Sequence, residues 1–246
     1  MRLLITLMAM LLLMAPVAHT QTADEIIAKY VKTIGGKDKL KAVKSIVRSG
    51  KFIGGGGFEA PLRQENKRPG MVRSEFTMQN LTGVTAYDGK TGWKIEPWGG
   101  KKDVENLDEG ELRSVEEDAD FDGPLIDYKA KGHTVKFLGM EPVDGTDAYK
   151  LEEKLKSGDT HTYYMDTDYY VPIKIEIKRT IRGNESEFFI NLGDYKEVNG
   201  VYYPFFQESG SKGSQFTGKT AYEKIEVNPP VADDRFSKPT PPATGK

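Results

Sequence analysis

Residues 173 to 178 read Ile173-Lys174-Ile175-Glu176-Ile177-Lys178, an apolar and a charged side chain in strict alternation. Successive side chains of a β-strand point to opposite faces, so this stretch indicates a strand with one face in a core and one in water. The same period continues at Phe188, Ile190 and Leu192. The pattern therefore predicts an antiparallel sheet with one solvated face.

Similar segments extend from this stretch in both directions, and turn signals such as Gly54-Gly55-Gly56-Gly57 and Asp88-Gly89 separate them. We expect about ten strands in all, which make a sheet that twists and curls. The predicted strands cover residues 48–53, 58–67, 71–79, 84–87, 92–96, 149–155, 173–178, 188–192, 202–207 and 216–227.

Helices are expected at only three places. Thr22-Ala23-Asp24-Glu25 has the form of a capping box, and apolar residues then recur at helical spacing as far as Ile34. A shorter helix follows, with Leu40 and Val43 on one face. The acidic segment 106–128 is typical of one or two short helices.

The two ends of the chain differ from the rest. Residues 1–20 combine Arg2, an uncharged apolar run and small residues before Gln21, which is the pattern of a secretory signal peptide cleaved at that point. Residues 237–246 form a Pro-rich tail without periodicity. We expect one domain over residues 21–236, exported to the periplasm and monomeric.

Composition excludes several functional classes. The 246 residues hold 35 Lys and Arg against 37 Asp and Glu, a net charge of −2, so no basic field would attract nucleic acid. Cysteine is absent, which excludes disulfides, Cys-ligated zinc and a lipidated N-terminal cysteine.

Signals for catalysis are weak. The mature chain keeps only His133 and His161 and has neither a Gly-x-Ser-x-Gly nor a His-Glu-x-x-His motif, and we interpret His161 as a surface strand residue. Asp118, Asp120 and Asp122 match the first half of an EF-hand loop, but its second half fails. We expect no enzyme, cofactor or metal, and leave open whether these three carboxylates bind a cation.

A curled sheet with so little helical cover has two outcomes, a filled core or an apolar hollow that accepts a ligand. Both stay open on periodicity alone. Trp98, between Pro97 and Gly99, either folds back onto the sheet or contacts a membrane or partner. The candidate lining of a hollow comes from apolar strand positions, namely Phe76, Met78, Trp93, Leu151, Ile175, Ile177, Phe188 and Ile190.

The order of several short motifs resembles the LolA/LolB-like lipoprotein carriers. In the first half these are Lys67-Arg68-Pro69, Arg73-Ser74-Glu75, Asp88-Gly89-Lys90-Thr91-Gly92-Trp93 and Pro97. In the second half they are Gly193-Asp194-Tyr195, Val198-Asn199-Gly200-Val201, Tyr203-Pro204, the segment 225–228 and Phe236-Ser237-Lys238-Pro239.

The resemblance implies an incomplete, curved antiparallel barrel with short helices as a lid over an apolar cavity. It also implies a carrier or sensor of acyl chains, of a lipoprotein or another amphipathic lipid, with Arg68 as a polar latch to the lid. The segment 104–128 is extra lid material relative to the usual carrier. The alternative is a scaffold of the cell envelope with a filled core, in which Trp98 and the lid helices contact a protein partner.

Overall fold

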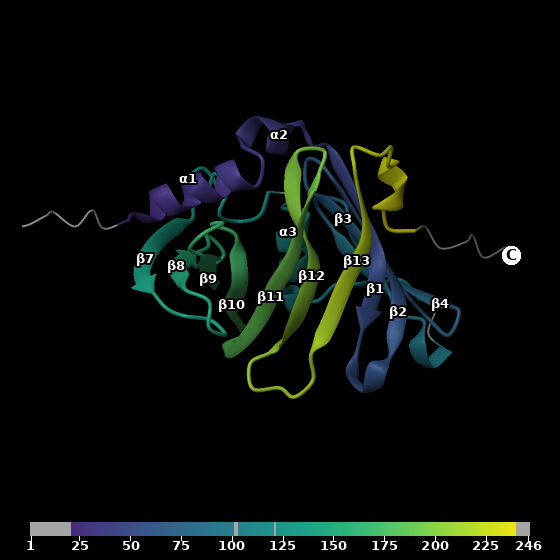
Figure 1. Cartoon of the computed structure of the whole chain (residues 1–246). Helices are drawn as coiled ribbons and strands as arrows, with labels where there is room; N and C mark the ends of the chain where they lie inside the picture. The colour runs from purple at the N-terminus through teal and green to yellow at the C-terminus, as the bar shows by residue number, and fades with distance from the viewer. Residues whose placement is uncertain (1–20, 101–102, 121, 240–246) are drawn as a thin grey trace, which may run out of the picture.

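The computed structural model describes residues 21–239 except 101, 102 and 121. Within these residues 13 strands form one sheet, in the order β6-β5-β4-β3-β2-β1-β13-β12-β11-β10-β9-β8-β7 (Figure 1). In chain order the strands are β1 (Ser45–Ile53), β2 (Glu59–Lys67), β3 (Met71–Met78), β4 (Leu81–Tyr87), β5 (Gly92–Ile95), β6 (Glu105–Asn106), β7 (Thr134–Met140), β8 (Ala148–Lys154), β9 (Thr160–Asp166), β10 (Pro172–Ile181), β11 (Asn184–Val198), β12 (Val201–Ser211) and β13 (Gly218–Val227).

The sheet consists of two meanders that meet in its middle. Strands β1 to β6 form one and β7 to β13 the other, and the antiparallel pair β1·β13 joins them. The two edge strands, β6 and β7, do not pair, so the curled sheet stays open. The predicted curved, incomplete antiparallel barrel is therefore confirmed.

Three α-helices accompany the sheet in the described part of the chain: α1 (Ala23–Thr33), α2 (Lys37–Ala42) and α3 (Glu109–Ala119). The predicted capping box begins α1, where Thr22 Oγ1 accepts from Glu25 N at 3.2 Å and Thr22 N donates to Glu25 Oε2 at 2.8 Å. Helices α1 and α2 lie over one end of the sheet, and α3 lies behind β11 and β12 (Figure 1). We call the sheet face that packs against the helices the inner face.

The largest apolar cluster lies between α1, α2 and the inner face. Ile26 of α1, Leu151 of β8 and Met165 of β9 are each completely buried in it. A smaller cluster joins α3 to the first meander through Val72, Val115 and Ala119. The apolar contacts of α1 and α2 and those of α3 therefore form two separate clusters.

The outer face of the first meander is covered by the C-terminal segment. Phe236 is completely buried and packs with Val47 and Val231. The indole Nε1 of Trp93 donates to Phe236 O at 2.8 Å. Beyond this point Lys238 Nζ donates to Asn106 Oδ1 at 2.8 Å, and residues 240–246 of the expected tail lie outside the described residues, as does the predicted signal segment 1–20.

Three strands, β6, β7 and β9, lie outside the predicted strand ranges. In β7 the alternation of Val135 and Phe137 ends at Gly139, where the pairing with β8 shifts register. The expectation that His161 lies on the surface is wrong, because its side chain is on the inner face of β9 and the residue is 3% exposed. No helix in the described ranges is long and apolar enough to cross a membrane.

Candidate functional site

A cavity of about 320 Å³ lies between the inner face, the helices α1 and α2, and the segment that follows α3. One wall is apolar. Ile175 of β10 is paired with Ile190 of β11, and Leu192 continues this wall along β11. Tyr30 of α1 and Ile34, directly after this helix, border it from the side of the helices. The strict alternation of β10 and β11 places these branched side chains on one face.

The opposite wall is polar and comes from β1 and β2. Arg48 Nη1 donates to Asn66 Oδ1 at 2.7 Å and to Gln64 Oε1 at 3.2 Å. Asn66 Nδ2 in turn donates to the carbonyl oxygen of Asp118 at 2.7 Å, which ties this wall to the end of α3. The cavity therefore joins an apolar surface to a positioned cation.

Four carboxylates border the same cavity, and three of them are paired with cations. Asp122 pairs with Arg68 at 2.7 Å, Asp120 with Lys131 at 2.6 Å, and Glu117 with Arg179 at 2.6 Å. These contacts neutralise the charges locally, and no group of three potential metal ligands occurs among the described residues.

Asp118 is the fourth carboxylate and makes no ion pair in the described part of the chain. The surrounding protein desolvates its carboxyl and Glu117 adds negative charge, which together raise its pKa to about 6. The side chain is nevertheless open to solvent, because it faces the cavity.

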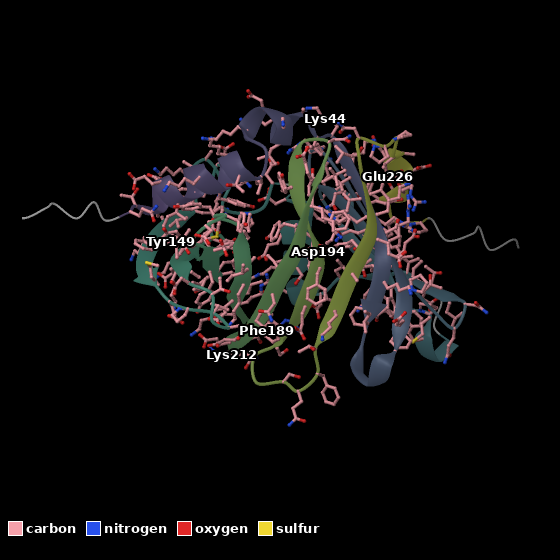
Figure 2. All side chains as sticks on the ribbon, in the orientation of Figure 1. Lys44, Tyr149, Phe189, Asp194, Lys212 and Glu226 are labelled. Atoms are coloured by element: carbon pink, nitrogen blue, oxygen red, sulfur yellow. The ribbon has the colours of Figure 1, made fainter. Side chains whose placement is uncertain are left out.

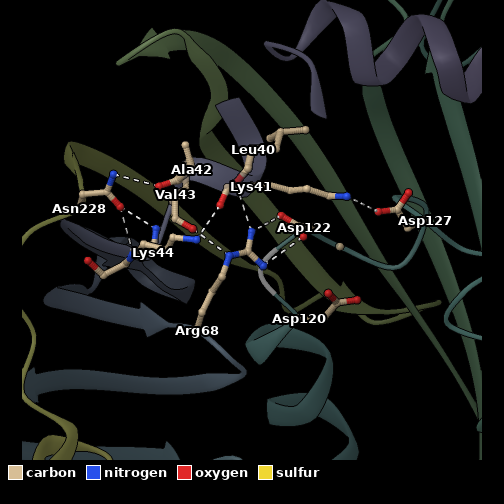
Figure 3. A network of polar contacts seen from close by, with 12 residues as sticks. Leu40, Lys41, Ala42, Val43, Lys44, Arg68, Asp120, Asp122, Asp127 and Asn228 are labelled. Carbon is tan, nitrogen blue, oxygen red and sulfur yellow. Dashed lines mark hydrogen bonds and ion pairs between the residues drawn. The ribbon is translucent and has the colours of Figure 1, made fainter. Parts of the chain in front are cut away.

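Arg68 connects the first meander to the lid segments (Figure 3). Its Nε donates to Val43 O at 2.8 Å and its Nη2 to Leu40 O at 3.1 Å, both at the C-terminal end of α2. Nη2 and Nη1 donate to the two carboxylate oxygens of Asp122 at 2.7 and 3.2 Å. One guanidinium thus holds α2 and the segment after α3 together, in the fork geometry that suits arginine.

A buried polar layer attaches α3 to the second meander. Arg179 of β10, 4% exposed, donates to Asp159 Oδ2 at 2.8 Å and to Glu117 Oε1 at 2.6 Å. His161 Nε2 lies 3.5 Å from Glu117 Oε2. Next to them Glu153 is completely buried, and burial raises the pKa of its carboxyl to about 7 although the Tyr163 hydroxyl opposes the shift.

Of the eight predicted lining residues, the structure brings Ile175 and Ile190 to the cavity. The next cross-strand pair, Ile177 and Phe188, borders a second hollow of about 590 Å³, which is lined mainly by polar and charged side chains. Phe189 and Lys212 belong to this second hollow and lie at the end of the sheet opposite α1 and α2 (Figure 2).

The other predicted lining residues lie elsewhere. Leu151 is completely buried in the core, and Trp93 packs on the outer face beneath Phe236. Phe76 stacks edge-on with Trp98 at 5.7 Å between ring centroids, and Met78 ends β3 opposite Leu81. We exclude these four residues from the proposed lining.

Trp98 folds back over the sheet. A Cβ on Gly83 would meet its Cζ2 at 2.8 Å, so the ring lies directly on the β4 backbone. Phe76 is also packed edge-on against Phe52 at 5.5 Å. The Trp98 ring therefore covers the sheet, which is the first of the two alternatives stated for this residue.

The polar wall was missed by the sequence analysis. Arg48, Gln64 and Asn66 fall on alternate positions of two predicted strands, and their register places Arg48 directly opposite Gln64. A search for polar residues at those strand positions that the alternation assigns to the apolar face would have found them. Tyr195, Tyr203 and Tyr222 of the cavity wall were also missed, because tyrosine suits either face of a sheet.

The fold of this chain also occurs in solved structures of other proteins. The sequence matches no protein-family model and none of the curated proteins. Among solved structures, it matches a LolA superfamily protein from Nitrosomonas europaea with a TM-score of 0.58 at 14% identity, covering 89% of this chain and 99% of that one. An outer membrane lipoprotein-sorting protein domain from Vibrio parahaemolyticus matches with a TM-score of 0.56 at 12% identity, over 81% and 93% of the two chains. A DUF1329 family protein from Desulfovibrio piger matches with a TM-score of 0.59 at 12% identity, over 89% and 98%. The chain therefore has the LolA-like fold.

Proposed function

We propose that this chain is an exported, non-catalytic carrier that shields the acyl chain of a lipoprotein or another amphipathic lipid from water. The observation that carries the proposal is the cavity of about 320 Å³ between the inner face and the helices, with its apolar wall of Ile175, Ile190 and Leu192. Each methylene that leaves water for such a wall contributes about 0.8 kcal/mol.

The size of the cavity indicates the size of the cargo. Its volume lies at the lower end of the range of about 300–1,000 Å³ that is typical of small-molecule sites. We infer that the present arrangement holds a single chain, and that a cargo with several chains requires α1, α2 or the segment after α3 to move.

The contacts of Arg68 support a latch between the sheet and the lid. Its hydrogen bonds reach Leu40 O, Val43 O and Asp122, so all three lid contacts depend on one side chain. Movement of α2 away from the cavity would break the first two together. The proposed periplasmic location rests on the signal-like residues 1–20 and on the carriers that share this fold.

Native mass spectrometry of the mature chain, purified from the periplasm of its host, tests the proposal. A discrete adduct that lipid extraction identifies as an acyl lipid or lipoprotein is the expected result. A fluorescent fatty acid titrated into delipidated protein provides a second measurement, with stoichiometric binding expected.

Two adjacent residues of β11 supply a matched pair of variants. Ile190→Glu puts a charge in the apolar wall and should lower the affinity for the fluorescent fatty acid at least tenfold. Phe189→Glu makes a comparable change on the other face of the same strand and should leave the affinity unchanged. Equal affinities for both variants and the wild type would contradict a carrier that uses this cavity.

A further inference from the structure

The guanidinium of Arg48 is unusual among the cations around the cavity. Arg68, Lys131 and Arg179 each pair with a carboxylate within 2.7 Å. Arg48 makes no ion pair in the described part of the chain, and its hydrogen bonds go to neutral amide oxygens only. A positioned cation that no carboxylate contacts directly is a receptor for an anion.

The geometry of these hydrogen bonds leaves one edge of the guanidinium unpaired. Both bonds, to Gln64 Oε1 and to Asn66 Oδ1, start from Nη1. Arginine carries five N–H donors, so those on Nε and Nη2 have no acceptor among the described residues. Nε and Nη2 together form the fork that binds both oxygens of a carboxylate or phosphate.

The surroundings hold this fork in place. Asn66 is 3% exposed, and its side-chain amide is oriented by the carbonyl oxygen of Asp118 at 2.7 Å. The ring of Tyr203 lies 6.0 Å from Arg48 Cζ. Little ordering remains to be done when an anion binds, because the guanidinium is already positioned.

We propose that Arg48 binds the anionic head group, a carboxylate or a phosphate, of a single-chain amphiphile whose tail lies on the wall of Ile175, Ile190 and Leu192. This inference rests on the proposed function and specifies the chemical class of the cargo. The apolar wall and the cation border one cavity, which favours an amphiphile over a free anion.

Asp118 opposes this binding. It is the unpaired carboxylate of the cavity, and it interacts electrostatically with Arg48. An anion that approaches Arg48 is repelled by Asp118 when that carboxyl is ionised. Replacement of Asp118 by its neutral isostere should therefore strengthen the binding of an anionic amphiphile.

Calorimetric titration at pH 8 with decanoate and 1-decanol, both below their aggregation limits, tests the proposal. We expect wild-type protein to bind decanoate about tenfold more tightly than decanol, from one charged bidentate contact. Arg48→Gln should remove most of this difference and leave the affinity for decanol within about twofold. Arg48→Lys should keep part of the preference, and Asp118→Asn should raise the affinity for decanoate a few-fold.

Lys51→Gln is the matched control, because it removes the same charge from β1 at an exposed position that pairs with Glu59 instead of facing the cavity. It should bind both ligands as the wild type does. Circular dichroism and thermal unfolding confirm that each variant is folded.

The remaining outcomes separate this inference from the proposed function. Equal affinities for decanoate and decanol, or an equal loss of both in Arg48→Gln, overturn the role of Arg48 and leave the carrier in place. Competition by inorganic phosphate or acetate at the concentration of decanoate overturns the amphiphile and identifies a free-anion site. If neither amphiphile binds the wild type, both proposals fail.

Discussion

The helices α1 and α3 cover the same inner face in different ways. Helix α1 attaches by apolar burial, with Ile26 completely buried in the main cluster. Helix α3 has a small apolar contact with β3 and β4. Its half-buried Glu117 meets the buried Arg179 of β10, which also bonds the buried Asp159 just before β9. Apolar burial holds α1 on the sheet, whereas α3 is held largely by ion pairs.

This difference has consequences for stability and motion. Apolar burial is non-directional and changes gradually as side chains shift. A buried ion pair depends on geometry, and the loss of one partner leaves an uncompensated charge. We therefore expect α3 and the segment after it to be the parts of the lid whose attachment responds to single polar changes and to pH.

The largest effect should come from the ionic attachment. Arg179→Met leaves the carboxylates of Asp159 and Glu117 without their shared cation and should lower the free energy of unfolding by about 3–5 kcal/mol. Urea denaturation measures this change. Arg182→Met, at an exposed position after the same strand, is the control and should cost less than about 0.5 kcal/mol.

The corresponding change in the apolar attachment is Ile26→Ala. It leaves a cavity at a completely buried position and should lower the free energy of unfolding by about 3 kcal/mol, also measurable with urea. Lys32→Ala on the exposed side of α1 should change it by less than about 0.5 kcal/mol. If Ile26→Ala behaved like Lys32→Ala, apolar burial would not be what holds α1.

The buried carboxyl of Glu153 should make the stability of the polar layer depend on pH. Its pKa is raised to about 7 in the folded chain, against 4.5 when unperturbed, so the folded state binds this proton more tightly than the unfolded state. The contribution of this group to stability is present below pH 4.5 and is lost as the pH rises to about 7, by about 1.4 kcal/mol for each pKa unit.

The free energy of unfolding, measured with urea, should fall less between pH 4.5 and 7 in Glu153→Gln than in the wild type. Glu152→Gln changes the neighbouring residue, whose side chain points to the other face of β8, and should keep the wild-type profile. Identical profiles for wild type and Glu153→Gln would show that the buried carboxyl does not titrate in this range.

The smallest expected effect on stability belongs to the latch. Arg68→Gln removes the fork to Asp122 and the bonds to Leu40 O and Val43 O, at a partly exposed site, and should cost about 1–2 kcal/mol. Hydrogen exchange should accelerate in residues 37–43 and 122–126 and stay unchanged in α1. Uniform acceleration over the whole chain would argue against a local latch.

Much of the fold could be predicted from local patterns. The alternation in β10 and β11, the capping box of Thr22 and Glu25, and the turn at Asp88-Gly89 each depend on residues close in sequence. The order of short motifs was enough to indicate the LolA-like fold, which the structural comparisons confirm. The expected one-sided solvation of the strands follows from the same alternation.

The candidate site was predicted less well. Ile175 and Trp93 follow the same apolar alternation, yet Ile175 faces the cavity and Trp93 packs on the outer face beneath Phe236. Alternation assigns residues to two faces without saying which face is hollow. His161 was misplaced for a related reason, because the buried polar layer that surrounds it is built from residues distant in sequence.

The sequence by itself determined the strands, the helix starts, the turns and the identity of the Arg68 motif, since each depends on short-range sterics and hydrogen bonding. Only the tertiary structure decided which face became the cavity, which cation remained unpaired in it, and which helix was held by ions. These features depend on the pairing of β1 with β13 and on the crossing of α3 over β10. Such contacts join residues more than 60 positions apart, so no local pattern encodes them.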